Sequence, residues 1–261
     1  MLHPILSYFR FLWYSKNEHA VHSPFVFKLL TNCFYQKNKT SELKQLAAYR
    51  KKQLSNTNVI EITDLGAGSR VFASNKRIIA DMAKKAGINK KRAQLLTRVI
   101  GYFAPKSILE LGTSVGLATS AISIGTQQYK SNATIISVEG CPTIANYART
   151  QLQDFGFENI QVINSEFSLY LKEFAQPTFD LVYFDGNHSK DATVAYFTSL
   201  LPNSHNDSVW IFDDIHWSKE MEEAWDYIKK HSKVTVTIDT YKWGFVFFRK
   251  EQPKEHFIIR V

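Results

Sequence analysis

The stretch Ser107-Ile-Leu-Glu-Leu-Gly112-Thr-Ser-Val-Gly116-Leu-Ala-Thr-Ser120 decides the fold of this chain. It opens as a short apolar run typical of a buried parallel strand, breaks at Gly112, and continues after Gly116 with apolar residues at helical spacing. Glycine permits a tight turn and lets a ligand approach the backbone, and the helix that follows offers unpaired N–H groups at its start. The stretch therefore predicts a strand, a turn and a helix that together hold a ligand.

The composition is that of a globular protein, with 44% hydrophobic and 14% aromatic residues in a chain of 261. No apolar run approaches the roughly 20 residues that a membrane-spanning helix needs. The N-terminus lacks the pattern of a secretory signal. Cys33 and Cys141 are too few for a disulfide framework and have no zinc spacing. We therefore expect a cytoplasmic protein.

The net charge of +8 permits a nucleic acid, an anionic membrane surface or an acidic substrate as partner. Apolar residues over 1–16 have the spacing of one helix face. Such a helix could lie on a membrane surface or line a substrate pocket, although packing on the rest of the protein is the commoner arrangement. Charge alone does not favour nucleic acid over plain solubility. The oligomeric state is not predictable from these features.

Strands and helices alternate strictly from Pro105 onward, which predicts an α/β fold with helices on both faces of a parallel sheet. The last two predicted strands have only a short connection between them, so they should pair as an antiparallel hairpin. We expect a Rossmann-like, seven-stranded, mostly parallel sheet in a domain over 105–261, and an N-terminal helical cap or extension over 1–104. The predicted strands are 107–111, 134–138, 160–164, 180–184, 209–212, 234–238 and 245–249.

Gly66 and Gly68 follow an apolar run and form a second candidate turn. A nucleotide-binding turn needs a following strand that ends in an acid about 20 residues later. The residues after this turn instead predict a helix over 75–85. We interpret the two glycines as a turn or lid element, with Asp64 and Arg70 available to face a substrate.

At the opening stretch, the next predicted strand does end in an acid, Glu139, where a carboxylate can accept both hydroxyls of a ribose. The spacing G-x-x-x-G, preceded by Glu110, differs from the G-x-G-x-x-G of dinucleotide-binding folds. The sequence Ile-Leu-Glu110-Leu-Gly112-Thr-Ser-Val-Gly116 resembles the first motif of class I S-adenosylmethionine-dependent methyltransferases. It is most similar to the small-molecule O-methyltransferase branch that includes the catechol and caffeoyl-CoA enzymes. The resemblance covers residues 107–250.

This resemblance implies S-adenosylmethionine as the cofactor. Asp185, which ends the fourth strand, would lie beside the reacting methyl group. The residues implied to border the cofactor are Glu110, Gly112, Thr113, Ser114, Gly116, Glu139, Gly140, Ser165, Glu166 and Asp185.

Carboxylates also follow two neighbouring predicted strands, at Asp185 and at the pair Asp213-Asp214. Three carboxylates at one sheet edge would repel one another unless they are protonated or bridged by a cation, and oxygen donors suit Mg²⁺ or another divalent ion. The resembling family holds a divalent cation at these positions, although the catechol enzymes carry asparagine where this chain has Asp214. The pair could instead only cap the helix that starts near Ser218.

His188 and His216 flank this predicted site, and either could act as general base because histidine titrates near neutral pH. We favour His188, which closely follows Asp185. The predicted function is methyl transfer from S-adenosylmethionine to an oxygen of a small molecule, helped by a divalent cation. The alternatives are methylation of RNA or another polyanion, a nicotinamide-dependent dehydrogenase, and a non-catalytic nucleotide-binding module. The missing G-x-G-x-x-G and the closing hairpin count against the dehydrogenase.

Overall fold

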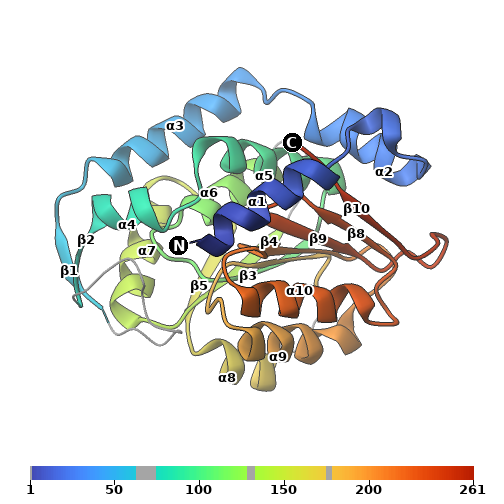
Figure 1. The fold of residues 1–261 in the computed structure, drawn as a ribbon. Helices are drawn as coiled ribbons and strands as arrows, with labels where there is room; N and C mark the ends of the chain where they lie inside the picture. The colour runs from blue at the N-terminus through green and yellow to red at the C-terminus, as the bar shows by residue number, and fades with distance from the viewer. Residues whose placement is uncertain (1, 63–74, 128–132, 175–177) are drawn as a thin grey trace. The chain divides into compact units, whose positions relative to one another are not determined.

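The structure, a computed structural model, describes residues 2–62, 75–127, 133–174 and 178–261 (Figure 1). The chain divides into two compact units. One comprises Met1–Leu30 and Ser168–Val261, and the other comprises Thr31–Phe167. We call them the carboxylate unit and the turn unit, after the predicted site residues that each contains, and describe each by itself.

The turn unit contains a parallel sheet in the order β3-β4-β5. Leu111 at the end of β3 lies opposite Val138 in β4, and Glu139 at the end of β4 lies opposite Asn164 in β5. The carboxyl ends of all three strands therefore meet at one edge. The elements are α3 (Thr40–Leu54), β1 (Val59–Glu61), β2 (Lys76–Ile78), α4 (Ile79–Lys85), α5 (Lys90–Phe103), β3 (Ser107–Leu111), α6 (Leu117–Gln127), β4 (Thr134–Glu139), α7 (Pro142–Asp154) and β5 (Ile160–Asn164), after a π-helical segment at Leu30–Phe34.

In the carboxylate unit the strand order is β10-β8-β9-β7-β6. Strand β6 runs parallel to β7, β9 runs antiparallel to both β7 and β8, and β10 runs parallel to β8. Helices α9 and α10 lie side by side (Figure 1). The elements are α1 (Leu2–Tyr14), α2 (Pro24–Leu29), α8 (Phe167–Phe174, whose first residue belongs to the turn unit), β6 (Leu181–Phe184), α9 (Lys190–Leu200), β7 (Val209–Asp213), α10 (Lys219–Lys230), β8 (Val236–Asp239), β9 (Trp243–Phe247) and β10 (Glu255–Ile258), with 3-10 turns at Glu18–Ala20 and Leu201–Asn203.

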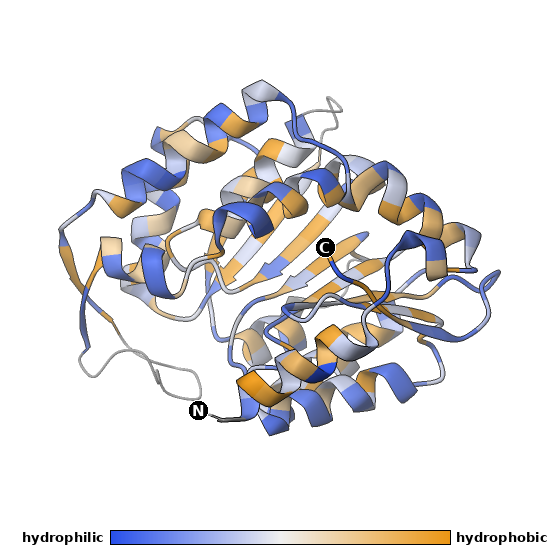
Figure 2. Cartoon of the chain, turned by 45° about the horizontal axis from the view of Figure 1, so that its top comes forward, coloured by the Kyte–Doolittle hydropathy of each residue, from blue (hydrophilic) through white to orange (hydrophobic). Residues whose placement is uncertain are grey.

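The core of the carboxylate unit is strongly aromatic. Every residue of β6, β7, β8 and β9 is buried, as expected for strands covered on both faces, and Figure 2 shows the strands mostly in the hydrophobic colour. Phe184 and Phe212 stack with ring centroids 4.1 Å apart, and Trp210 packs edge-on against Phe197. This packing fixes the ends of β6 and β7, which carry the predicted carboxylates.

The α/β class, the mainly parallel sheet and the closing antiparallel pair are confirmed. Two sequence expectations are wrong in detail. The helix predicted over 75–85 begins only at Ile79, because residues 76–78 form β2 and pair antiparallel with β1. Strand β10 is an unpredicted further strand, since its mixed composition, Glu255-His-Phe-Ile, lacks the apolar run of a buried strand.

Two further expectations, the second glycine turn and the domain boundary, stay predictions. The candidate turn with Asp64, Gly66, Gly68 and Arg70 lies outside the described residues. A domain boundary at 104/105 remains a prediction. In the part of the chain that the structure describes, every helix is too short or too polar to cross a bilayer.

Candidate functional site

The glycine turn, residues 112–116, links β3 to α6 through several left-handed backbone conformations. Gly112 has φ of 110°, Gly116 has φ of 77°, and even Ser114 lies at 48°. Side chains with a Cβ avoid this region, which explains why glycine occupies both ends of the turn. The turn is closed by a hydrogen bond of 2.9 Å from Gly116 N to the carbonyl oxygen of Thr113. The predicted strand–turn–helix unit is thus confirmed.

Tyr49 supports this turn from α3. Its side chain is fully buried, and its hydroxyl donates a hydrogen bond of 3.0 Å to the carbonyl oxygen of Val115. Its ring packs edge-on against Phe155 and Phe157. No motif identifies Tyr49. The only sequence signal is a tyrosine on the apolar face of an otherwise charged helix.

Replacing Gly116 by alanine should therefore destabilise the protein by about 3 kcal/mol, by combining backbone strain with overpacking. A Cβ there would lie 2.6 Å from Tyr49 Oη and 3.1 Å from Leu152 Cδ2. The matched control is Gly156→Ala, because Gly156 also has positive φ but would place its Cβ in open space. That control should cost about 1 kcal/mol. Urea denaturation measures both, and equal losses would contradict the packing argument.

Glu110 lies beneath the turn and is fully buried. Its Oε2 accepts hydrogen bonds from Thr119 Oγ1 at 2.6 Å and from Ser137 Oγ at 2.5 Å, and Ser137 Oγ lies 2.6 Å from Thr113 Oγ1. Burial raises the pKa of Glu110 to about 7, against the opposing effect of these hydroxyls. Glu110 was predicted to border the cofactor. In the structure its carboxylate is linked to Thr113 by way of Ser137, and its place beside the cofactor stays a prediction.

Glu139 reaches from the end of β4 to the turn. Its Oε2 accepts a hydrogen bond of 2.9 Å from Ser114 N, and its Oε1 accepts one of 3.0 Å from Cys141 N. Burial raises the pKa of Glu139, while the backbone N–H groups of Cys141, Ser114 and Gly140 act to lower it. Glu139, the carboxylate predicted to bind the ribose, is thus held beside the glycine turn by hydrogen bonds.

The loop after β5 joins the same edge. Asn164 Nδ2 donates to the carbonyl oxygens of Glu139 and Gly140, both at 2.9 Å, and Ser165 N donates to Glu139 O at 3.1 Å. Glu166 is exposed, and its carbonyl oxygen accepts a hydrogen bond from Ser165 Oγ. The structure therefore gathers the predicted cofactor residues of the turn unit, with Glu166 at the rim.

The carboxylate unit places Asp185 and Asp213 at the ends of adjacent parallel strands, since Phe184 lies opposite Phe212. Asp185 accepts a hydrogen bond of 3.2 Å from the Tyr183 hydroxyl, and its Oδ1 lies 3.8 Å from His188 Nε2. This separation is longer than a hydrogen bond, so Asp185 acts on His188 as a nearby charge, and the role of His188 as base stays a prediction.

Asp213 and Asp214 differ in their surroundings. Asp213 is buried, and its Oδ1 accepts a hydrogen bond of 2.9 Å from Asp214 N. Asp214 has a φ of 52°, and its Oδ1 lies 3.0 Å from Lys242 Nζ. The cap of α10 is Ser218, whose hydroxyl accepts from Met221 N, so the capping alternative for the aspartate pair is wrong.

Asp185, Asp213 and Asp214 are not gathered into a metal-binding cluster in the described residues. Within residues 2–62, 75–127, 133–174 and 178–261, no three or more acidic, histidine or cysteine side chains gather to hold a metal ion. Asp185 and Asp213 have the donor type and strand position for a hard cation, whereas Lys242 pairs with Asp214. The three-carboxylate site remains a prediction.

His216 is held by two carboxylates. Its Nδ1 lies 2.7 Å from Glu222 Oε1, its Nε2 lies 2.8 Å from Asp239 Oδ2, and its ring stacks on Tyr241. Burial alone would lower the pKa of His216, but Asp239 and Glu222 outweigh burial and raise it. Both ring nitrogens are engaged and the charged form is favoured, which argues against His216 as the base. His188 is left as the predicted one.

The raised pKa of His216 makes stability depend on pH. The charged form is favoured in the folded state, so its contribution is complete below the unfolded pKa near 6.5 and is lost as pH rises through the raised folded pKa. The wild type should therefore lose thermal stability as the pH rises from about 6.5 to ~9, and His216→Gln should lose less over the same range. Melting temperatures of wild type and variant across this window test this, and parallel curves would contradict it.

The sequence and the fold of this chain were compared with those of known proteins. A family model described as a methyltransferase domain matches residues 109–215. A methyltransferase from Podospora anserina, solved with S-adenosylhomocysteine, superposes with a TM-score of 0.61 at 14% identity, covering 87% of this chain and 94% of that one. A search of the curated proteins finds no match.

Two further solved structures share the fold. An O-methyltransferase from Bacillus cereus in complex with S-adenosylhomocysteine gives a TM-score of 0.55 at 16% identity, covering 85% of this chain and 94% of that one. A putative caffeoyl-CoA O-methyltransferase from Staphylococcus aureus gives 0.53 at 16% identity, covering 62% and 84%. At these identities the similarity establishes the fold. Residues 109–215 thus match the model of a methyltransferase domain, and the chain has the fold of these solved methyltransferases.

Proposed function

We propose that this protein transfers the methyl group of S-adenosylmethionine to an oxygen atom of a small molecule. The observation that carries the proposal is the Glu139 carboxylate, fixed between Ser114 N and Cys141 N beside the left-handed glycine turn. The printed names of similar structures, an O-methyltransferase and a putative caffeoyl-CoA O-methyltransferase, support oxygen as the acceptor atom and a small molecule as its carrier.

The hydrogen-bonding groups of the turn unit match those of S-adenosylmethionine. Each Glu139 oxygen accepts one backbone N–H, which leaves lone pairs on both oxygens for the two hydroxyls of a ribose. Glycines at 112 and 116 let the methionine part of the cofactor approach the backbone closely. Gly140, Ser165 and the exposed Glu166 are proposed to border the adenine side.

The reaction needs little covalent help from the protein, because the sulfonium carbon is already activated. The acceptor oxygen forms a bond to the methyl carbon as the carbon–sulfur bond breaks, which yields a methyl ether and S-adenosylhomocysteine. The proton of the acceptor hydroxyl passes to His188 Nε2, which lies 3.8 Å from the Asp185 carboxylate. The protein otherwise contributes alignment of donor and acceptor.

A divalent cation such as Mg²⁺ is part of the proposal. Asp185 and Asp213 would hold it, and Asp214 would join them only if it releases Lys242. Such a cation, when bound, polarises an acceptor oxygen and lowers the pKa of its hydroxyl.

Chelation tests the cation separately from methyl transfer. With labelled S-adenosylmethionine and catechol or caffeate as acceptor, EDTA should lower the rate at least ~10-fold, and excess Mg²⁺ should restore it. Full activity in EDTA would refute the cation while leaving methyl transfer intact. A parallel assay offers transfer RNA as the methyl acceptor. Labelling of RNA but not of the small molecules would overturn the acceptor class.

A further inference from the structure

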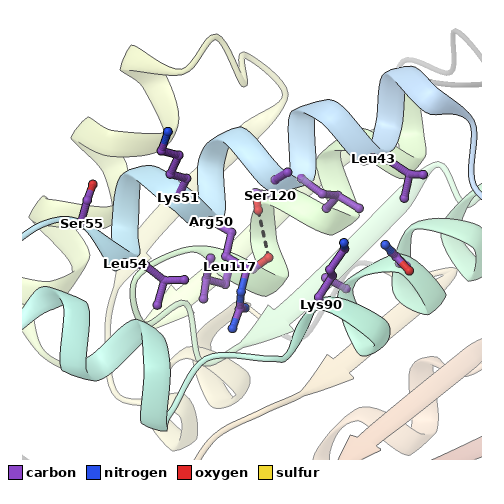
Figure 3. Close-up of a pocket in the computed structure, with 12 residues that line it drawn as sticks. Leu43, Arg50, Lys51, Leu54, Ser55, Lys90, Leu117 and Ser120 are labelled. Carbon is purple, nitrogen blue, oxygen red and sulfur yellow. Dashed lines mark hydrogen bonds between the residues drawn. The ribbon is translucent and has the colours of Figure 1, made fainter.

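The turn unit contains a cavity of about 340 Å³ between α3, α5 and the start of α6 (Figure 3). Its walls are mainly aliphatic, from Leu43, Leu46, Leu54, Ala93 and Leu117. The hydroxyl of Ser120, which also lines it, donates to the carbonyl oxygen of Leu117, so it adds little polarity to the space. A volume of this size suits a small molecule with an apolar body.

Two cationic side chains enter this apolar space from opposite walls. Figure 3 shows Arg50 extending from α3 and Lys90 from α5 into the gap between the two helices; Lys51 also lines the cavity, but its side chain extends away from the gap. Arg50 is fixed by a hydrogen bond of 2.5 Å from its Nη1 to the carbonyl oxygen of Ile88, and burial lowers its pKa. No acidic residue is among the described residues that line the cavity. The site therefore carries positive charge beside an apolar surface without an internal counter-ion.

We propose that this cavity binds a small amphiphile with a carboxylate head and an aliphatic or aromatic body. Arg50 and Lys90 would pair with the head by charge-assisted hydrogen bonds, and the leucines would cover the body. A neutral lipid would leave the two cations unpaired, and a purely polar anion would leave the leucine wall exposed to water. The two features together select an amphiphilic carboxylate.

The cavity is a different site from the glycine turn, although α3 serves both. Leu46, Arg50 and Leu54 follow one another at four-residue spacing and line the cavity. Tyr49 lies on another face of α3 and contacts the turn at Val115. None of the predicted cofactor residues lines the cavity, so a ligand bound there should not compete with the cofactor.

Calorimetric titration of the full chain with decanoate tests this proposal. Decanoate should bind at one site, decan-1-ol about 10-fold more weakly, and inorganic phosphate not measurably. Saturation with S-adenosylhomocysteine should change the affinity for decanoate less than about twofold, since the sites are separate.

Variants locate the binding. Lys90→Gln should weaken decanoate binding about 10-fold, whereas the neighbouring Lys91→Gln, an exposed lysine that does not line the cavity, should leave it unchanged. Ala47→Trp fills the cavity from an exposed position on α3 and should abolish binding. Unchanged affinity in both Lys90→Gln and Ala47→Trp, equal binding of decanol, or competition by S-adenosylhomocysteine would each overturn the proposal.

Discussion

Glu139→Gln is expected to weaken the binding of S-adenosylhomocysteine about 100-fold. Both Glu139 oxygens accept backbone N–H groups, one from Ser114 in the turn and one from Cys141 at the start of α7. An amide presents one acceptor and one donor, so its NH₂ group would face one of these N–H donors. The substitution thus loosens the turn and also removes the charge-assisted hydrogen bonds proposed for the ribose.

Calorimetric titration measures this effect directly. Glu158→Gln is the matched control, because Glu158 is an exposed glutamate of the same unit, away from the turn, and it should bind S-adenosylhomocysteine like the wild type. Equal affinity in Glu139→Gln and wild type would show that the cofactor does not use this carboxylate. Circular dichroism of the variant distinguishes loss of the site from loss of the fold.

Asp185→Asn is expected to lower kcat about 1000-fold while changing the affinity for S-adenosylhomocysteine less than about fivefold. Asp185 lies 3.8 Å from His188 Nε2 and, by proposal, both orients this base and donates to the cation. An amide keeps the size of the side chain but removes the negative charge that favours proton transfer to His188.

Turnover with labelled S-adenosylmethionine and a separate binding titration distinguish the two effects. Asp191→Asn, at an exposed aspartate in the first turn of α9, should leave turnover unchanged. A fall in affinity as large as the fall in kcat would instead make Asp185 a cofactor residue only. A kcat within a few-fold of the wild type would remove Asp185 from the chemistry.

The elements nearest the opening stretch were predictable because their signals are local. An apolar run, a glycine and a resumed helical period fix β3 and α6 without reference to distant residues. Glu139 was predictable for the same reason, since it ends the next strand. The bounds of β3, 107–111, agree with the prediction.

The unpredicted features depend on contacts between residues far apart in the sequence. Tyr49 meets Val115 across 66 positions, and Ser137 meets Glu110 across 27. Lys242 reaches Asp214 across 28 positions, after the pairing of β7 with β9 has brought the ends of these strands together. The first contact depends on the packing of α3 against the turn, and the other two depend on which strands become neighbours in the sheet; none of these is a local signal in the sequence.

Titration of the full chain with S-adenosylmethionine in a calorimeter, with NADH as the matched nucleotide control, tests the central claim most directly. We predict binding of S-adenosylmethionine at one site with a dissociation constant on the order of micromolar, and no heat of binding for NADH. The absence of S-adenosylmethionine binding at millimolar concentration by folded protein would contradict the account.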